Sequence, residues 1–345
     1  SMSFPQDKSK EFLLALLNSK LSKMYLEIIN PTMNNSVGDV KKIPLVTKFD
    51  DEIKGLVLEC IEIAKNDWNS REISWNFSRS PLLKPLTSIA LSLAQWESDV
   101  LDDLLSLRKL EERINEKLIA IYGLEDELKS EVELKDITIL QDELKLEILS
   151  TWGNSISPSR EKSPISRAVV IKNLLSFSVG CFLGRYRLDK PGLNIAYPLE
   201  SQEELSAYKY NGITFEIDDD AIIPIMGVES PFSDDIVQRV QQFVLMVWGE
   251  DSYTENLNFI NEALGEDLEK YLTRKFWDFH RKMYKKRPIY WQFASPNGAF
   301  KVLTYMHRMN RFTVQKIRQN YLFKQKKQYF QIHLEQIVQF QYMEE

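Results

Sequence analysis

Glycine and proline are scarce in this sequence, with 12 and 13 copies in 345 residues. Because these residues mark most turns, their scarcity argues against a loop-rich β architecture and favours long helices. Cysteine is scarcer still, since Cys60 and Cys181 are the only two and stand far apart. Isolated cysteines exclude a Cys-x-x-Cys metal clamp, and so low a number is typical of a reducing cytoplasm.

Long hydrophobic runs are also missing. The longest unbroken apolar stretch extends from Phe243 to Trp248, whereas a transmembrane helix needs about 20 residues. The sequence shows no signal peptide either. We therefore expect a cytoplasmic protein that makes no membrane contacts.

The residues that are present indicate a globular protein with uneven charge. Apolar residues make up 43% and charged residues 27% of the chain, and this length suffices for two or three domains. The formal net charge is −6, but residues 274–327 contain fifteen Lys or Arg and one Asp. This basic segment thus carries +14, which leaves about −20 for the rest of the chain.

Two interpretations of the basic segment stay open. Clustered cations neutralise phosphates, so the segment is a candidate footprint for nucleic acid. Alternatively, it forms a solvated basic face that docks on the acidic remainder of the same chain. The two interpretations can also hold together.

The spacing of apolar residues predicts a mainly α fold, because they recur every three or four positions. Helices are predicted at residues 7–29, 49–69, 87–122, 166–183, 234–248, 254–283, 299–309 and 313–341, with two shorter ones within 125–150. Strands are predicted at residues 213–217 and 221–225, joined by an acidic turn, and at 289–293. We expect a multi-helix fold with a long central helix pair and a small β element at about residues 205–226 and 289–293.

Cations and aromatic side chains stand together most densely in residues 284–293, around a chain break at Pro288. Cations hold phosphates and aromatic rings stack on bases, so this stretch favours nucleic-acid binding. The alternative is structural, because Ile289, Trp291 and Phe293 alternate and would then face the core of a small sheet. The guanidinium groups of Arg287 and Arg308 suit bidentate pairing with either a phosphate or a carboxylate.

Motifs for methyl transfer are absent from the sequence. An Asn/Asp-Pro-Pro-aromatic turn would hold a flipped adenine, but Asn30-Pro31-Thr32 lacks the second proline and the aromatic residue. The glycines never cluster into a turn for a methyl donor. Two Asp-Glu-Leu-Lys stretches, at 126–129 and 142–145, fit a nuclease motif only weakly and are more typical of a solvated helix face. We therefore predict no catalytic, cofactor-binding or metal-binding residue in this chain.

Several stretches resemble, in family order, the PglX or BrxX adenine-specific DNA methyltransferases of the BREX phage-defence systems. Residues 1–47 resemble the end of a target-recognition domain. The stretches that carry the resemblance most clearly are Ser74-Trp75-Asn76-Phe77, Ile121-Tyr122-Gly123-Leu124, Gly180-Cys181-Phe182-Leu183-Gly184-Arg185-Tyr186, Lys286-Arg287-Pro288-Ile289-Tyr290-Trp291 and Tyr305-Met306-His307-Arg308.

The resemblance implies the carboxy-terminal part of such an enzyme, without its methyl-transfer domain. The parent enzyme would use S-adenosylmethionine, and this chain alone would have no cofactor and no enzyme activity. Three parts are expected: residues 1–47 from the target-recognition domain, a helical spacer at 48–164, and an α-rich domain with the sheet and basic segment at 165–345. The expected function is DNA binding and specificity in phage defence, and the alternative is a helical scaffold that docks other BREX proteins. The partner would be double-stranded DNA, and the DNA-binding candidates are Lys285, Lys286, Arg287, Trp291, Arg308, Arg311 and Arg185.

Overall fold

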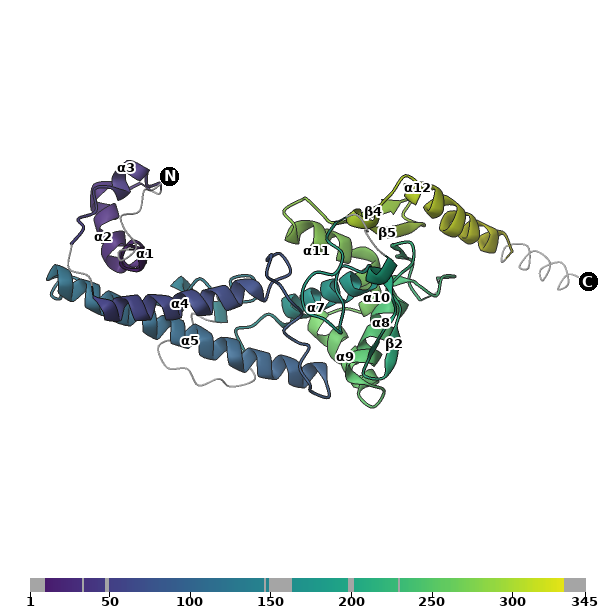
Figure 1. The fold of residues 1–345 in the computed structure, drawn as a ribbon, viewed down its shortest axis with the longest axis horizontal. Helices are drawn as coiled ribbons and strands as arrows, with labels where there is room; N and C mark the ends of the chain where they lie inside the picture. The colour runs from purple at the N-terminus through teal and green to yellow at the C-terminus, as the bar shows by residue number, and fades with distance from the viewer. Residues whose placement is uncertain are drawn as a thin grey trace, which may run out of the picture. The chain divides into compact units, whose positions relative to one another are not determined.

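A computed structural model describes residues 10–32, 34–46, 50–145, 147–148, 163–197, 202–228 and 230–331. Helices dominate it and the strands are few and short (Figure 1), which confirms the predicted mainly α fold with a small β element. The chain divides into two compact units. Unit 1 contains Ser1–Trp68 and Glu97–Ser166, and unit 2 contains Asn69–Trp96 and Arg167–Glu345.

Unit 1 is built on two long helices, α4 (Asp51–Asn69) and α5 (Ile89–Tyr122), which run side by side in Figure 1. Their apolar faces meet at Val57 and Leu118, in a core that also takes residues from α1 and α2. Lys117 near the end of α5 pairs with Asp50 at the start of α4, at 3.2 Å. The first four elements are α1 (Lys10–Asn18), α2 (Lys20–Ile29), α3 (Val37–Val40) and α4.

Two predictions for unit 1 need correction. The helix predicted at residues 7–29 is broken at Ser19, whose hydroxyl accepts from the Ser22 amide (3.3 Å) and so caps α2. Residues 125–145 form turns and one short 3-10 helix, η1 (Leu134–Asp136), where a helix was predicted, whereas residues 147–148 are helical. Buried residues there follow a nearly alternating pattern, at Val132, Leu134, Ile137 and Ile139, and this pattern does not suit a helix.

Helix α7 (Arg167–Phe182) is the centre of unit 2. Nearly every side chain from Val170 onward is buried, because helices α8 (Ile236–Trp248), α9 (Tyr253–Leu264) and α11 (Phe276–Met283) all pack against it. Such a helix has no polar face, as expected for a position inside the core. Helix α10 (Leu268–Arg274) joins the group through α8 and α9.

A three-stranded antiparallel sheet lies beside these helices, in the order β3 (Ile222–Pro224), β5 (Lys301–Tyr305) and β4 (Tyr290–Ala294). Ile222 and Val302 pack with Ile317 and Tyr321 of the C-terminal helical segment. That segment begins with α12 (Thr313–Lys316) and the π-helical turn η5 (Ile317–Leu322) and stays helical to residue 331. A separate hairpin pairs β1 (Tyr208–Tyr210) with β2 (Ile213–Phe215), and η3 (Gln202–Leu205) precedes it.

Three predictions for unit 2 also need correction. Residues 299–309 form strand β5 followed by the 3-10 turn η4 (Met306–Arg308), rather than a helix. Both faces of β5 are covered, so its residues 302–305 are all buried and show no alternation that would reveal a strand. The strands at 213–217 and 221–225 do not pair with each other but belong to different sheets. The helix predicted at 254–283 is three helices, since Gly265 ends α9 in the left-handed conformation and Asp267 caps α10.

Parts of two predicted helices lie outside the described residues, namely positions 7–9 of the first and 332–341 of the last. In the described part of the chain, no helix is both long enough and apolar enough to cross a membrane.

Candidate nucleic-acid interface

Residues 285–287, named the basic turn, connect α11 to strand β4. The turn closes when the Lys286 amide donates to the Arg281 carbonyl (2.8 Å), with Lys285 and Lys286 at φ angles of 50° and 64°. These left-handed angles cost about 1–2 kcal/mol for a residue with a side chain. Lys285, Lys286 and Arg287 are all exposed, and no carboxylate of a described residue forms an ion pair with them.

His280 holds the two ends of the basic turn together. Its ring is fully buried on α11, and Nε2 accepts hydrogen bonds from the amides of Ile289 (3.2 Å) and Tyr290 (3.1 Å). Burial, and then the nearby Arg185 charge, lower the pKa of His280 to about 3. The imidazole is therefore neutral at physiological pH, as an accepting nitrogen must be.

A buried polar group supports Tyr284, the residue before the turn. The Tyr284 hydroxyl donates to Glu72 Oε1 at 3.2 Å, and the Arg185 guanidinium lies over the Tyr284 ring at 5.5 Å. Arg185 also donates from Nε to the Tyr186 hydroxyl (2.8 Å). Arg185, one of the seven DNA-binding candidates, therefore packs against Tyr284 and does not belong to the exposed surface. Burial raises the pKa of Glu72.

Arg308 is also held inside unit 2. Its guanidinium donates to the carbonyls of Leu183 (3.3 Å) and Asp219 (2.9 Å). Asp219 lies in the acidic turn, residues 218–220. Backbone carbonyls thus take these two donors, whereas the pairing predicted for this guanidinium was with a phosphate or a carboxylate.

The acidic turn also anchors the C-terminal helical segment. The Tyr321 hydroxyl donates to Asp234 (3.0 Å) and to Asp220 (3.2 Å). Burial, together with the neighbouring Asp220 charge, raises the pKa of Asp218 to about 7. Tyr321, an uncharged residue of the basic segment, is thus bonded to acidic residues of the same unit.

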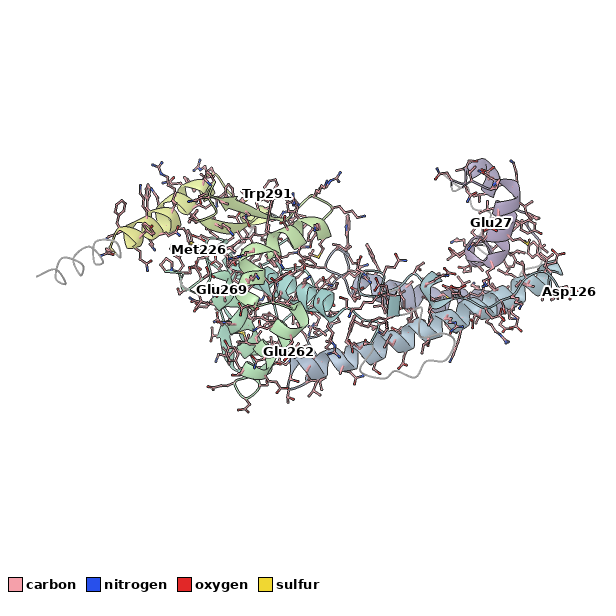
Figure 2. All side chains as sticks on the ribbon, turned by 180° about the vertical axis from the view of Figure 1, so that it is seen from behind. Glu27, Asp126, Met226, Glu262, Glu269 and Trp291 are labelled. Atoms are coloured by element: carbon pink, nitrogen blue, oxygen red, sulfur yellow. The ribbon has the colours of Figure 1, made fainter. Side chains whose placement is uncertain are left out.

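Trp291 and Arg311 remain exposed. Trp291 is 47% exposed on the edge strand β4, and Figure 2 marks it in the part of unit 2 from which the C-terminal helical segment extends. The buried residue of this strand is Tyr290 instead, so the expectation that Trp291 faces the core is wrong. The Arg311 guanidinium lies over the neighbouring Phe312 ring at 4.6 Å. Five of the seven candidates are therefore exposed: Lys285, Lys286, Arg287, Trp291 and Arg311.

Sequence reasoning missed two residues, the buried Glu72 that supports Tyr284 and the exposed Trp75. Phe77 is buried and Trp75 is 97% exposed, although only one residue separates them. The neighbours of Trp75 contain an overlooked signal for a turn, since Ser74 and Asn76 on either side of Trp75 are turn-forming residues.

Unit 1 contains a separate cavity of about 270 Å³, lined mainly by apolar residues of α1, α4 and α5. Glu111 lines it, and burial together with the nearby Asp136 charge raises the pKa of this carboxyl to about 7. Cys60 lines it as well, and burial raises the pKa of its thiol to about 12, so the thiol is unreactive at neutral pH. Among the described residues, no group of three His, Cys, Asp or Glu is arranged to hold a metal ion.

Comparison with known proteins places these features in a family context. The chain is 36% identical over 329 residues to the adenine-specific methyltransferase BrxX of Escherichia coli O9:H4 (strain HS). It is 34% identical over 328 residues to the adenine-specific methyltransferase PglX of Lacticaseibacillus casei (strain Zhang). The chain is a relative of BrxX and PglX. No family model matches it.

Each BrxX/PglX match covers 90% of this chain but only 26% or 25% of the relative. The chain thus spans about a quarter of the length of the curated relatives that it matches. The predicted relationship to PglX and BrxX is confirmed, and the predicted place at the carboxy-terminal end of such a protein stays a prediction.

Proposed function

We propose that this chain is the DNA-binding and specificity portion of a phage-defence adenine-specific DNA methyltransferase, without its methyl-transfer domain. The observation that carries the proposal is the basic turn, where three exposed cations have no carboxylate partner among the described residues. Exposed cations without partners gain energy when they displace counterions from a phosphate backbone. The relatives' names, which specify adenine methylation, support DNA as the polyanion.

Fluorescence anisotropy with a labelled duplex tests this proposal. We expect binding that weakens steeply as salt rises from about 50 to about 200 mM, because each phosphate contact adds about 0.9 to the slope of log K against log salt. The variant Lys285→Glu/Lys286→Glu should bind at least tenfold more weakly and reduce that slope by about 2.

The matched control is Lys190→Glu/Lys209→Glu, which reverses two exposed charges elsewhere in unit 2. Equal weakening by the control pair would show a non-specific charge effect. Absence of binding at low salt and micromolar protein would refute the proposed function of this chain.

A second candidate function is a scaffold for other defence proteins. Helix α4 exposes Leu58 (48%), Ile61 (39%) and Trp68 (51%). Their spacing places them on one side of the helix, and such an apolar stripe is typical of a docking surface. Capture of partner proteins on immobilised chain after nuclease treatment tests it, and Leu58→Gln/Ile61→Gln should abolish the capture.

A further inference from the structure

Trp75 is kept exposed to solvent by a turn whose residues on both sides are anchored in unit 2. Before it, Glu72 is buried, and the buried Ser74 donates from Oγ to Asn69 Oδ1 (2.9 Å). After it, the buried Phe77 packs edge-on against Phe177 and Tyr186, with ring centroids at 5.9 and 5.4 Å. Trp75 itself is 97% exposed. The exposure is therefore imposed by the fold around it.

Such an exposure is unfavourable unless a ligand covers the ring. Tryptophan is among the side chains that gain most from leaving water. A polar residue at this position would allow the same backbone hydrogen bonds in the turn, so the turn itself does not require tryptophan. A rigidly presented tryptophan also loses little conformational freedom on binding, which is why tryptophan is enriched at the centres of binding sites.

The turn that presents Trp75 is hydrogen-bonded to Tyr284, the residue before the basic turn. The Tyr284 hydroxyl lies 3.2 Å from Glu72 Oε1 and 3.5 Å from the Glu72 carbonyl. Tyr284 immediately precedes Lys285, and Glu72 stands three residues before Trp75. One hydrogen-bonded contact therefore joins a segment carrying an exposed indole to a segment carrying three exposed cations.

The charges at this contact favour a polyanion. The Glu72 carboxyl is buried and accepts from Tyr284. Lys285, Lys286 and Arg287 have no ion-pair partner in the described part of the chain. An exposed indole on a segment that is hydrogen-bonded to the segment of unpaired cations can stack on a base while the cations hold its phosphates.

We infer that Trp75 stacks on an unpaired or unstacked base of DNA whose backbone is held by the basic turn. The inference rests on the proposed DNA-binding function and adds a ligand feature to it. The preferred substrate is then a duplex with a displaced base rather than a uniform duplex. Loss of base stacking leaves the number of phosphate contacts unchanged, so its effect differs from that of removing a cation.

The test is a comparison of two variants of the full chain, Trp75→Ala and Lys285→Ala/Lys286→Ala, on a duplex with one mismatched base pair. Trp75→Ala should weaken binding about tenfold, in line with the energy of stacking on one base, and leave the salt slope unchanged. Trp75→Phe should retain most of the affinity. The lysine variant should reduce the salt slope by about 2.

Trp68→Ala is the matched control, because Trp68 is also exposed but lies in unit 1. It should leave the affinity unchanged. Wild-type affinity in Trp75→Ala, together with weakening in the lysine variant, would overturn the stacking role and leave DNA binding in place. Loss of binding that is equal on mismatched and fully paired duplexes would also overturn it. If the wild-type chain binds neither duplex, the proposed function fails as well.

Discussion

The imidazole Nε2 of His280 accepts hydrogen bonds from the amides of Ile289 and Tyr290, and these bonds fix where the basic turn ends. It can do this only while it is neutral. Its ring also stacks on Tyr290, with centroids 4.3 Å apart. A single buried side chain thus determines the position of three exposed cations.

We predict that His280 makes the stability of unit 2 pH-dependent. The pKa of the folded state is about 3, below the ordinary value of 6.5. Between these values the unfolded chain binds a proton that the folded chain excludes, so His280 lowers stability as the pH falls. At neutral pH, His280→Ala should cost about 2–4 kcal/mol through lost hydrogen bonds and a cavity.

Urea unfolding of both proteins between about pH 7 and about pH 4 measures this effect. The difference in unfolding free energy between wild type and His280→Ala should shrink steadily with acidification. A constant difference across this range would contradict a neutral, proton-excluding His280. His307→Ala provides the comparison: burial and the Arg185 charge lower the pKa of His307 too, but this ring is only half-buried, so its effect should have the same sign and be smaller.

At the scale of elements, the basic turn combines strain and charge. Its two lysines occupy the left-handed region that glycine adopts freely. We predict that Lys285→Gly/Lys286→Gly stabilises unit 2 by about 1 kcal/mol, because it relieves this strain. The same change should weaken DNA binding at least tenfold, because it removes two phosphate contacts.

Thermal unfolding and duplex anisotropy on the same samples separate the two effects. Lys285→Arg/Lys286→Arg is the control, since it keeps the charge and the strain and should leave both quantities near wild type. A glycine variant that binds DNA like the wild type would remove the basic turn from the interface.

Elements with a clear spacing of apolar residues could be predicted from the sequence. Prediction failed where tertiary packing determined the secondary structure or the burial of a side chain. The long helix α5 and strand β4 are each within two residues of their predicted ends, because their apolar spacing and flanking breaks are distinct. Strand β5 was predicted as a helix because it is covered on both faces. At the site, exposure of the basic turn followed from its charge. The half-buried position of Arg185 and the exposure of Trp75 did not follow, because contacts between residues 99 and 212 positions apart in the chain set both.

At the scale of the whole molecule, the two units are interleaved in the sequence. Residues 69–96 belong to unit 2, although residues 97–166 of unit 1 separate them from its remainder. Phe77, Leu82, Ile89 and Leu93 are buried. The Ile89 amide donates to Asn256 (2.8 Å) and the Gly192 amide to the Ser78 carbonyl (2.7 Å). The α-rich region after residue 165 is therefore completed by a segment from far upstream.

We predict that a fragment of residues 165–345 does not fold alone. Four buried apolar side chains are each worth about 1.5–3 kcal/mol, and their sum approaches the entire stability of a typical domain, about 5–15 kcal/mol. A chain that joins residues 69–96 to 167–345 through a Gly/Ser linker should fold. Near-ultraviolet circular dichroism during heating measures this, and a cooperative transition of the isolated fragment at the wild-type temperature would contradict it.

The interleaving of the two units also determines the order in which the packing partners of unit 2 are synthesised. Residues 69–96 leave the ribosome before the 70 residues of Glu97–Ser166, which take roughly 4–14 s at about 5–20 residues per second. During that interval α7, the helix against which Phe77 packs, does not yet exist. The nascent chain therefore carries an apolar segment without the surface that it packs against in the folded protein.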